Sequence, residues 1–132
     1  MKVSFDFDGV LSTKESVRDY AKELIARGID VWICTARYAD GSKNSFWGNT
    51  SNSDIYFIAK ELGIPDSNII FTNMEDKSPY LDKLKPLWHL DDDGYILREI
   101  HENSSVPPVD VNSPTWKEQC EILIRMILGC TK

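Results

Sequence analysis

Short apolar runs alternate along the chain with longer stretches in which apolar residues recur every three or four positions. The short runs predict buried strands and the longer stretches predict amphipathic helices, because these periods match the two kinds of backbone. Strands are predicted over 3–7, 30–35, 68–72, 87–91 and 106–111, the last as an edge strand or loop because it holds two prolines. Helices are predicted over 16–27, 54–62, 78–84 and 95–103, with caps at Ser53 and Ser113 for the second helix and for a final one that starts at Pro114.

Strand and helix in alternation predict an α/β fold with a parallel sheet covered by helices on both faces. We therefore expect a three-layer α/β/α sandwich with a Rossmann-like sheet of about five strands. The chain has 132 residues, which fits a single domain over 1–132 and leaves no room for a large cap domain.

Charge and cysteine content exclude several classes of function. The net charge is −6 and the pI is about 4.8, which argues against binding to long nucleic acids, since these need a basic surface. The three cysteines are odd in number and form no Cys-x-x-Cys pair, so a disulfide framework or zinc site is not expected. No apolar run reaches the roughly 20 residues of a membrane span, and no signal peptide precedes the first strand, which predicts a cytoplasmic protein.

Reactive side chains follow the predicted strands at the ends where each strand finishes. Asp6 and Asp8 close the first strand, and Thr35 closes the second. Lys77 follows the third strand, and the run 91–93 of three aspartates closes the fourth. Ligands of open α/β sheets bind beyond the carboxyl ends of the strands, so we expect these groups to converge on one site.

Clustered carboxylates of this kind favour a phosphoryl-transfer chemistry that uses Mg²⁺. Asp6 and Asp8 lie two residues apart on an extended segment, so their side chains share a side, and Asp91 or Asp92 would join them. A hard divalent cation relieves their repulsion and offsets the charge of a bound phosphate. One carboxylate could attack phosphorus, and a second could transfer protons.

The same residues resemble the motifs of the haloacid dehalogenase-like (HAD) superfamily, in the order in which that superfamily carries them. The segment 3–11, VSFDFDGVL, resembles the first motif closely, and 31–35, VWICT, resembles the second. Lys77 at the start of a short helix resembles the third motif, and 88–92, WHLDD, the fourth. The helix that begins by about Ser16 leaves no space for the usual cap insertion, so the resemblance is to the cap-less subgroup.

The resemblance implies a role for each carboxylate. Asp6 would be the nucleophile and Asp8 the general acid and base, with both at the metal, Asp8 through its backbone carbonyl. Asp91 would bind Mg²⁺, with Asp92 as a second ligand or orienting group. The implied activity is a Mg²⁺-dependent phosphomonoester hydrolase with an aspartyl-phosphate intermediate, since the Asp two places after the nucleophile marks phosphatases rather than dehalogenases.

The resemblance also implies how the substrate is held, since Thr35 and Lys77 would bind the transferring phosphoryl group. Ala36 and Arg37 follow Thr35 directly, which makes them further candidates for substrate binding, although Arg37 could equally be a surface residue. We expect a small phosphometabolite such as a nucleotide or sugar phosphate. Sites without a cap are open, so they suit larger substrates or are closed by oligomerisation.

Several assignments stay open at the level of sequence. Lys83 and Lys85 compete with Lys77 for the lysine role, and any of the aspartates in 91–93 could be the metal ligand. The polar loop 38–52 is a candidate lid, and His89 reads as a hydrogen-bonded core residue. Two other functions compete: a non-catalytic HAD-like module that binds metal or phosphate, and a phospho-accepting receiver domain, which the order of acidic residues and lysine along the chain disfavours.

Overall fold

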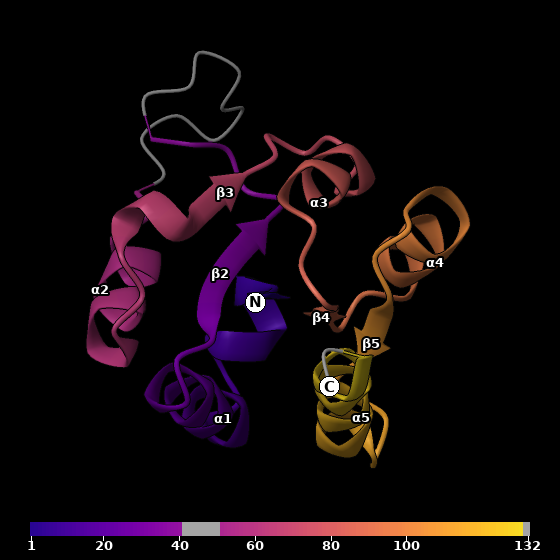
Figure 1. Ribbon diagram of the computed structural model, residues 1–132. Coiled ribbons are helices and arrows are strands. Elements are labelled where there is room, and N and C mark those ends of the chain that lie inside the picture. Colours follow the sequence, from indigo (N-terminus) through magenta and orange to yellow (C-terminus); the bar gives the residue numbers. More distant parts are fainter. Residues whose placement is uncertain (41–50, 131–132) are drawn as a thin grey trace.

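Parallel strands form one sheet at the centre of the computed structural model, which describes residues 1–40 and 51–130 (Figure 1). The strand order is β3-β2-β1-β4-β5, and every neighbouring pair is parallel. The strands are β1 (Lys2–Phe5), β2 (Asp30–Thr35), β3 (Ile69–Phe71), β4 (His89–Asp91) and β5 (Pro108–Asp110).

Helices connect the strands and cover both faces of the sheet. They are α1 (Glu15–Ala26), α2 (Ser53–Leu62), α3 (Ser78–Leu84), α4 (Gly94–Asn103) and α5 (Trp116–Cys130), with helical turns η1 (Phe7–Leu11) and η2 (Asp66–Asn68). In Figure 1, α3 and α4 lie together on one side of the sheet, with α1 and α5 on the other.

Two apolar clusters define the layers. The larger contains buried residues of α1, α2 and α5, and the smaller contains buried residues of α3 and α4. Alternate residues of one strand belong to different clusters: Ile33 packs in the larger and Cys34 in the smaller. The sheet is thus covered on both faces, which confirms the predicted three-layer α/β/α fold.

Element boundaries differ from the prediction where capping decides them. The last helix begins at Trp116, because Ser113 and Pro114 form a separate turn in which the Ser113 carbonyl accepts the Trp116 N–H. The second helix begins at Ser53, so Asn52 rather than Ser53 holds the N-cap position, without a capping bond from its side chain. The edge strand predicted around the two prolines is present as β5. In the described part of the chain, no helix is long and apolar enough to cross a membrane.

The strand order places the first strand beside the fourth. The chain runs from β1 outward to β2 and β3, then returns to the other side of β1 to form β4 and β5. The point where the direction of winding reverses, between β1 and β4, is where open α/β sheets bind ligands.

Candidate active site

Three carboxylates meet at the carboxyl ends of β1 and β4. Asp6 directly follows β1, Asp91 ends β4, and Asp92 follows it. One oxygen from each lies within 4.8 Å of the others. Asp91 is fully buried and Asp6 is 6% exposed, whereas Asp92 reaches the surface, so the cluster is buried on the side of Asp6 and Asp91 and open to water at Asp92. The convergence predicted from the sequence for Asp6, Asp91 and Asp92 is therefore present.

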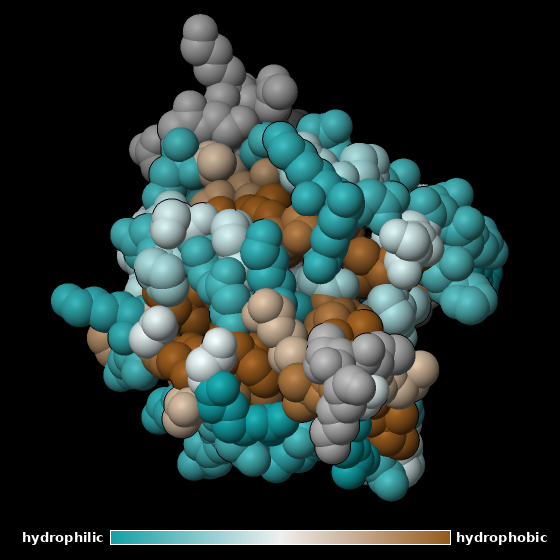
Figure 2. All heavy atoms as spheres, viewed as in Figure 1, coloured by the Kyte–Doolittle hydropathy of each residue, from teal (hydrophilic) through white to brown (hydrophobic). Residues whose placement is uncertain are grey.

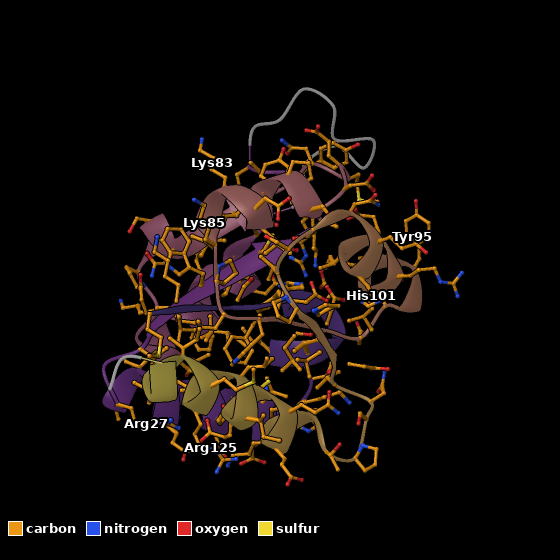
Figure 3. The ribbon with its side chains drawn as sticks, turned by 45° about the vertical axis from the view of Figure 1, so that its right-hand side comes forward. Arg27, Lys83, Lys85, Tyr95, His101 and Arg125 are labelled. Atoms are coloured by element: carbon orange, nitrogen blue, oxygen red, sulfur yellow. The ribbon has the colours of Figure 1, made fainter. Side chains whose placement is uncertain are left out.

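Lys77 supplies the ammonium group of the cluster. It directly precedes α3, is 2% exposed, and places its Nζ 2.7 Å from Asp91 Oδ2 and 3.1 Å from Asp6 Oδ1. The rival candidates Lys83 and Lys85 are exposed on α3, where Figure 3 shows them on its outer side. Lys77 is thus the lysine that the fold brings to the carboxylates.

Asp91 is surrounded by hydrogen-bond donors. Its Oδ2 accepts from Lys77 Nζ and from His89 Nε2, both at 2.7 Å. Its Oδ1 accepts from the backbone N–H groups of Asp92 at 2.9 Å and Asp93 at 3.2 Å. A carboxylate accepts about four hydrogen bonds, so the protein already fills the capacity of Asp91.

The charges of the cluster do not balance, since one ammonium faces three carboxylates. Burial raises the pKa of Asp6 to about 8; Lys77 opposes the rise and the charge of Asp91 adds to it. Burial opposes ionisation of Asp91 as well, but the hydrogen bond from His89 and the charge of Lys77 hold its pKa below the usual range. Burial and the charge of Asp91 also raise the pKa of Asp92. A second cation beside Asp6 and Asp92 would offset this excess negative charge, and an oxygen-only donor set suits Mg²⁺.

The absence of a side chain at Gly9 leaves room for the Asp92 carboxylate. Gly9 lies in η1 with φ of +74°, a left-handed conformation that favours glycine. A Cβ atom at this position would collide with the Asp92 carboxylate. The turn after Asp6 therefore has to carry glycine for the Asp92 side chain to lie against it.

Asp8 is held by Arg37 rather than by the cluster. Arg37 Nη2 and Nε donate to the two Asp8 oxygens at 2.6 and 2.9 Å, and the same guanidinium donates to Asp54 at 2.8 and 2.9 Å. The guanidinium also lies 5.2 Å from the Phe7 ring centroid. Hydrogen bonds to Asp8 and Asp54 raise the pKa of Arg37 further above its usual range. In this arrangement Arg37 faces carboxylates on both sides, which differs from the substrate contact expected from the sequence.

Thr35 and Ala36 stand one strand away from Asp6. Phe5, the last residue of β1, lies opposite Ile33 in the sheet, so Thr35 lies two residues beyond this pair on β2. Thr35 is 1% exposed, and its hydroxyl accepts the Arg37 N–H at 3.3 Å. Ala36 lines a pocket next to Lys77.

The pocket measures about 200 Å³ and lies between the segment after β3 and the start of α4. Exposed Met74 and Tyr95 stand on its two sides, and Figure 3 shows Tyr95 pointing outward from α4. Four carboxylates line it: Glu75, Asp76, Asp93 and Glu99.

The backbone at one wall of this pocket is held in an uncommon conformation. Asn73 and Met74 have φ of +54° and +66°, values that cost energy outside glycine. The Met74 N–H donates to the Ala36 carbonyl at 2.7 Å, and the Asn73 N–H donates to the Arg37 carbonyl at 3.2 Å. These bonds tie the wall of the pocket to the end of β2.

Two further predictions concern Asp93 as a metal ligand and the loop 38–52 as a lid. Asp93 caps α4, with its carboxylate accepting the Tyr95 and Ile96 N–H groups at 2.8 and 3.2 Å, so it serves the helix. The proposed lid 38–52 lies mostly outside the described residues. Its described ends are tied together, since Asn52 Nδ2 donates to the Tyr38 carbonyl at 2.9 Å.

Sequence reasoning missed the polar residues beneath the cluster and beside Asp8. The sequence predicts that His89 is a buried residue with its hydrogen bonds formed, and the structure confirms this. The sequence does not predict that one of these bonds is to Asp91. The signal was the spacing: residues two apart on a strand share a face, so His89 lies with Asp91, and Ser4 with Asp6. Asp54 carried no such signal, because its contact with Arg37 depends on how α2 packs.

Comparison with known proteins shows similarity in the fold. No family model matches the chain, and no curated protein sequence matches it. A solved structure from Vibrio cholerae, provisionally assigned as a 3-deoxy-D-manno-octulosonate 8-phosphate phosphatase, is similar with a TM-score of 0.50 and 20% identity. The matched region covers 89% of this chain and 70% of the Vibrio chain. The universal stress protein from Archaeoglobus fulgidus in complex with dAMP gives a TM-score of 0.48 and 16% identity, covering 82% and 94% of the two chains. At these identities the likeness concerns the fold alone.

Proposed function

We propose that this protein is a Mg²⁺-dependent phosphomonoester hydrolase of the HAD type, with Asp6 as its nucleophile. The observation that carries the proposal is the convergence of buried Asp6 and Asp91 and the more exposed Asp92 around Lys77 at the switch point of the sheet. The sequence motifs and the phosphatase assignment of the Vibrio protein with a similar fold support the same reading.

Asp6 and Asp92 are the carboxylates we assign to the metal. Asp91 is the weaker candidate, because its oxygens already accept four hydrogen bonds, and we assign it to Lys77 instead. This assignment refines the expectation that Asp91 is the first ligand. When bound, Mg²⁺ would offset the charge of the carboxylates and of the substrate phosphate.

In the first step, a carboxylate oxygen of Asp6 attacks phosphorus and the bond to the leaving oxygen breaks. Asp8 gives its proton to that oxygen, which leaves as an alcohol. In the second step, water attacks the phosphorus of the aspartyl-phosphate, and Asp8 takes the proton of this water. Inorganic phosphate leaves and the Asp6 carboxylate is restored.

Lys77 and Thr35 stabilise the negative charge of the phosphoryl oxygens during both steps, since phosphoryl transfer depends mainly on positioning and charge. Arg37 holds both oxygens of Asp8 and so fixes the plane of the carboxyl group that moves the proton.

The pocket beside Lys77 is where we expect the leaving group of the substrate. Its volume of about 200 Å³ suits a small group, which agrees with a small phosphometabolite. Its carboxylates oppose a leaving group that carries a negative charge. For this reason we do not transfer the sugar-acid phosphate in the name of the Vibrio protein to this chain.

The test is hydrolysis of p-nitrophenyl phosphate by the wild type and Asp6→Asn, each with Mg²⁺ and with EDTA. We expect metal-dependent turnover in the wild type and a loss of at least about 1,000-fold in Asp6→Asn, or about 4 kcal/mol in barrier height. Turnover that survives the substitution would contradict the proposal. Thermal stabilisation by Mg²⁺ without turnover of this ester or of a panel of phosphometabolites would favour a non-catalytic binding module.

A further inference from the structure

A chain of buried hydrogen bonds runs beneath the carboxylates, from Ser4 on β1 to Asp6 directly after that strand. Ser4 Oγ lies 2.8 Å from His89 Nδ1, and His89 Nε2 lies 2.7 Å from Asp91 Oδ2. The chain continues through Lys77 Nζ to Asp6 Oδ1. Ser4 and His89 are fully buried and lie opposite each other in the sheet. The proposed mechanism uses Asp6 and Lys77 but leaves Ser4 and His89 without a role.

The partners of His89 define which ring nitrogen carries hydrogen. Nε2 faces a carboxylate oxygen at 2.7 Å, so Nε2 carries hydrogen and donates to Asp91. Nδ1 then accepts the hydroxyl hydrogen of Ser4. Burial and the charge of Lys77 lower the pKa of His89, which agrees with a neutral ring. Lys77 Nζ, 3.4 Å from Nε2, therefore approaches a second donor and is directed onto the shared oxygen of Asp91.

This arrangement determines how Asp91 presents its carboxylate. Lys77 and His89 share Oδ2, while the two backbone N–H groups hold Oδ1. Without the His89 donor, Oδ2 would keep only the flexible lysine as its partner. The Lys77 ammonium could then turn more of its N–H groups toward Asp91 and move away from Asp6, because Asp91 would offer the less satisfied oxygen.

We propose that His89, oriented by Ser4, is a positioning residue that fixes Asp91 so that the Lys77 ammonium stays directed at the phosphoryl site beside Asp6. The inference rests on the proposed phosphatase function. It assigns the Nε2–H tautomer to His89 and a supporting role to the Ser4 hydroxyl. His89 itself touches neither the substrate nor the reacting atoms.

The kinetic test compares His89→Leu with His89→Gln, whose side-chain amide can donate to Asp91 in place of Nε2–H. We expect His89→Leu to lose about 10–100-fold in kcat, the usual effect of removing such a supporting group, with KM changed less than about threefold. We expect His89→Gln to recover most of the loss and Ser4→Ala to show a smaller one. His101→Gln is the matched control, since His101 is exposed on α4 (Figure 3) and should behave as the wild type.

Thermal unfolding of the same variants separates positioning from folding. A loss of kcat in His89→Leu that His89→Gln does not recover at equal stability would overturn the proposal, as would full kcat in His89→Leu. Absence of turnover in the wild type is a different failure, because it removes the proposed function.

A second readout does not depend on turnover. The chain contains two histidines, so ¹⁵N spectra of the imidazole rings, with His101→Gln used for assignment, report the tautomer of His89 directly. We expect the Nε2–H form at pH 7, with part of that preference lost in Ser4→Ala. An Nδ1–H tautomer or a charged ring in the wild type would overturn the inference, whatever the enzyme assays show.

Discussion

At the scale of single residues, the protein compensates the charge of Asp6 less than that of Asp91. Lys77 lies closer to Asp91 than to Asp6, and the pKa of Asp6 rises to about 8 while that of Asp91 falls. As the proposed nucleophile, Asp6 has to be ionised, so we expect it to need a further cation at neutral pH. The metal-free protein and the metal-bound protein should therefore respond differently to pH.

The first prediction concerns stability without metal. Asp6 keeps its proton in the folded state up to about pH 8, whereas in the unfolded chain it loses it near its ordinary value of 3.8. Between these values the folded state binds more protons, so this group's contribution to stability is full below pH 3.8 and is lost as pH rises toward 8. In EDTA at pH 8, Asp6→Asn should therefore have the higher Tm, by roughly 3–5 °C for each 1 kcal/mol gained.

Thermal unfolding of the two proteins from pH 5 to 8.5 measures this difference. The gap in Tm should widen with pH, and Mg²⁺ should raise the Tm of the wild type more than that of Asp6→Asn. A constant gap at every pH would show that Asp6 does not carry a raised pKa.

The second prediction concerns Gly9, where an added methyl group would collide with Asp92. Gly9→Ala should lower kcat by more than about 100-fold, because Asp92 would be displaced from the proposed metal site. Gly28→Ala is the matched control: Gly28 also has a positive φ, of +81°, but a Cβ there meets nothing within 4 Å. Both variants should lose about 1–2 kcal/mol of stability from the left-handed backbone, measured by urea unfolding. Equal activity in the two variants would contradict the role of Gly9.

At the scale of elements, Arg37 links the end of β2 to the Asp8 turn and to the start of α2. Arg37→Lys keeps a charge but loses the two-pronged contact with Asp8. We expect about a tenfold loss in kcat and less than about 1 kcal/mol of stability, since Asp8 and Asp54 are half exposed. Asp54→Asn, which leaves the Asp8 contact in place, should lose less activity. A larger loss of kcat in Asp54→Asn than in Arg37→Lys would show that the contact of Arg37 with α2, rather than its contact with Asp8, supports activity.

Elements were predictable from the sequence wherever local chemistry determines them. The bounds of β2 and α3 match the prediction. The apolar run that ends in Thr35 determines where β2 ends. The Ser-Pro pair that starts α3 and the proline at position 86 determine where this helix begins and ends. The start of α5 was not predictable, since Ser113 and Pro114 suit a turn as well as a cap. The first strand ends at Phe5 rather than at residue 7, because the chain turns after Asp6 through Gly9.

At the scale of the whole molecule, the site depends on strand order, which no local pattern reveals. Asp6 and Asp91 are distant in sequence and meet because β4 pairs with β1. The motif order along the chain was enough to predict that Asp6, Lys77, Asp91 and Asp92 converge. The motif order could not predict that four hydrogen bonds already occupy the oxygens of Asp91, or that Arg37 binds Asp8, since both follow from side-chain packing.

A prediction at this scale concerns the charge of the substrate. The acidic pocket should favour glycerol 3-phosphate over 3-phosphoglycerate, which carries a carboxylate where the first carries a hydroxymethyl group. We expect a ratio of about tenfold or more in kcat/KM, equivalent to about 1.4 kcal/mol. Asp76→Asn should narrow the ratio, because Asp76 is exposed in the pocket lining. Equal or better hydrolysis of 3-phosphoglycerate would contradict this view of the pocket.

Apolar side chains also reach the surface around α5, as Figure 2 shows in its lower half, with Ile122, Met126 and Ile127 among them.

The most direct test of the central claim is to trap the phosphorylated carboxylate. The protein is mixed with p-nitrophenyl phosphate and Mg²⁺, quenched in acid within milliseconds, reduced with borohydride, and digested with trypsin. An acyl phosphate on Asp6 would appear as homoserine at that position in the peptide 3–14, which also contains Asp8 as an internal control. We predict homoserine at position 6, dependent on Mg²⁺ and absent without substrate. Turnover with modification at Asp8 instead, or with neither residue modified in a quench fast enough to precede the second step, would contradict the assignment of Asp6 as the nucleophile.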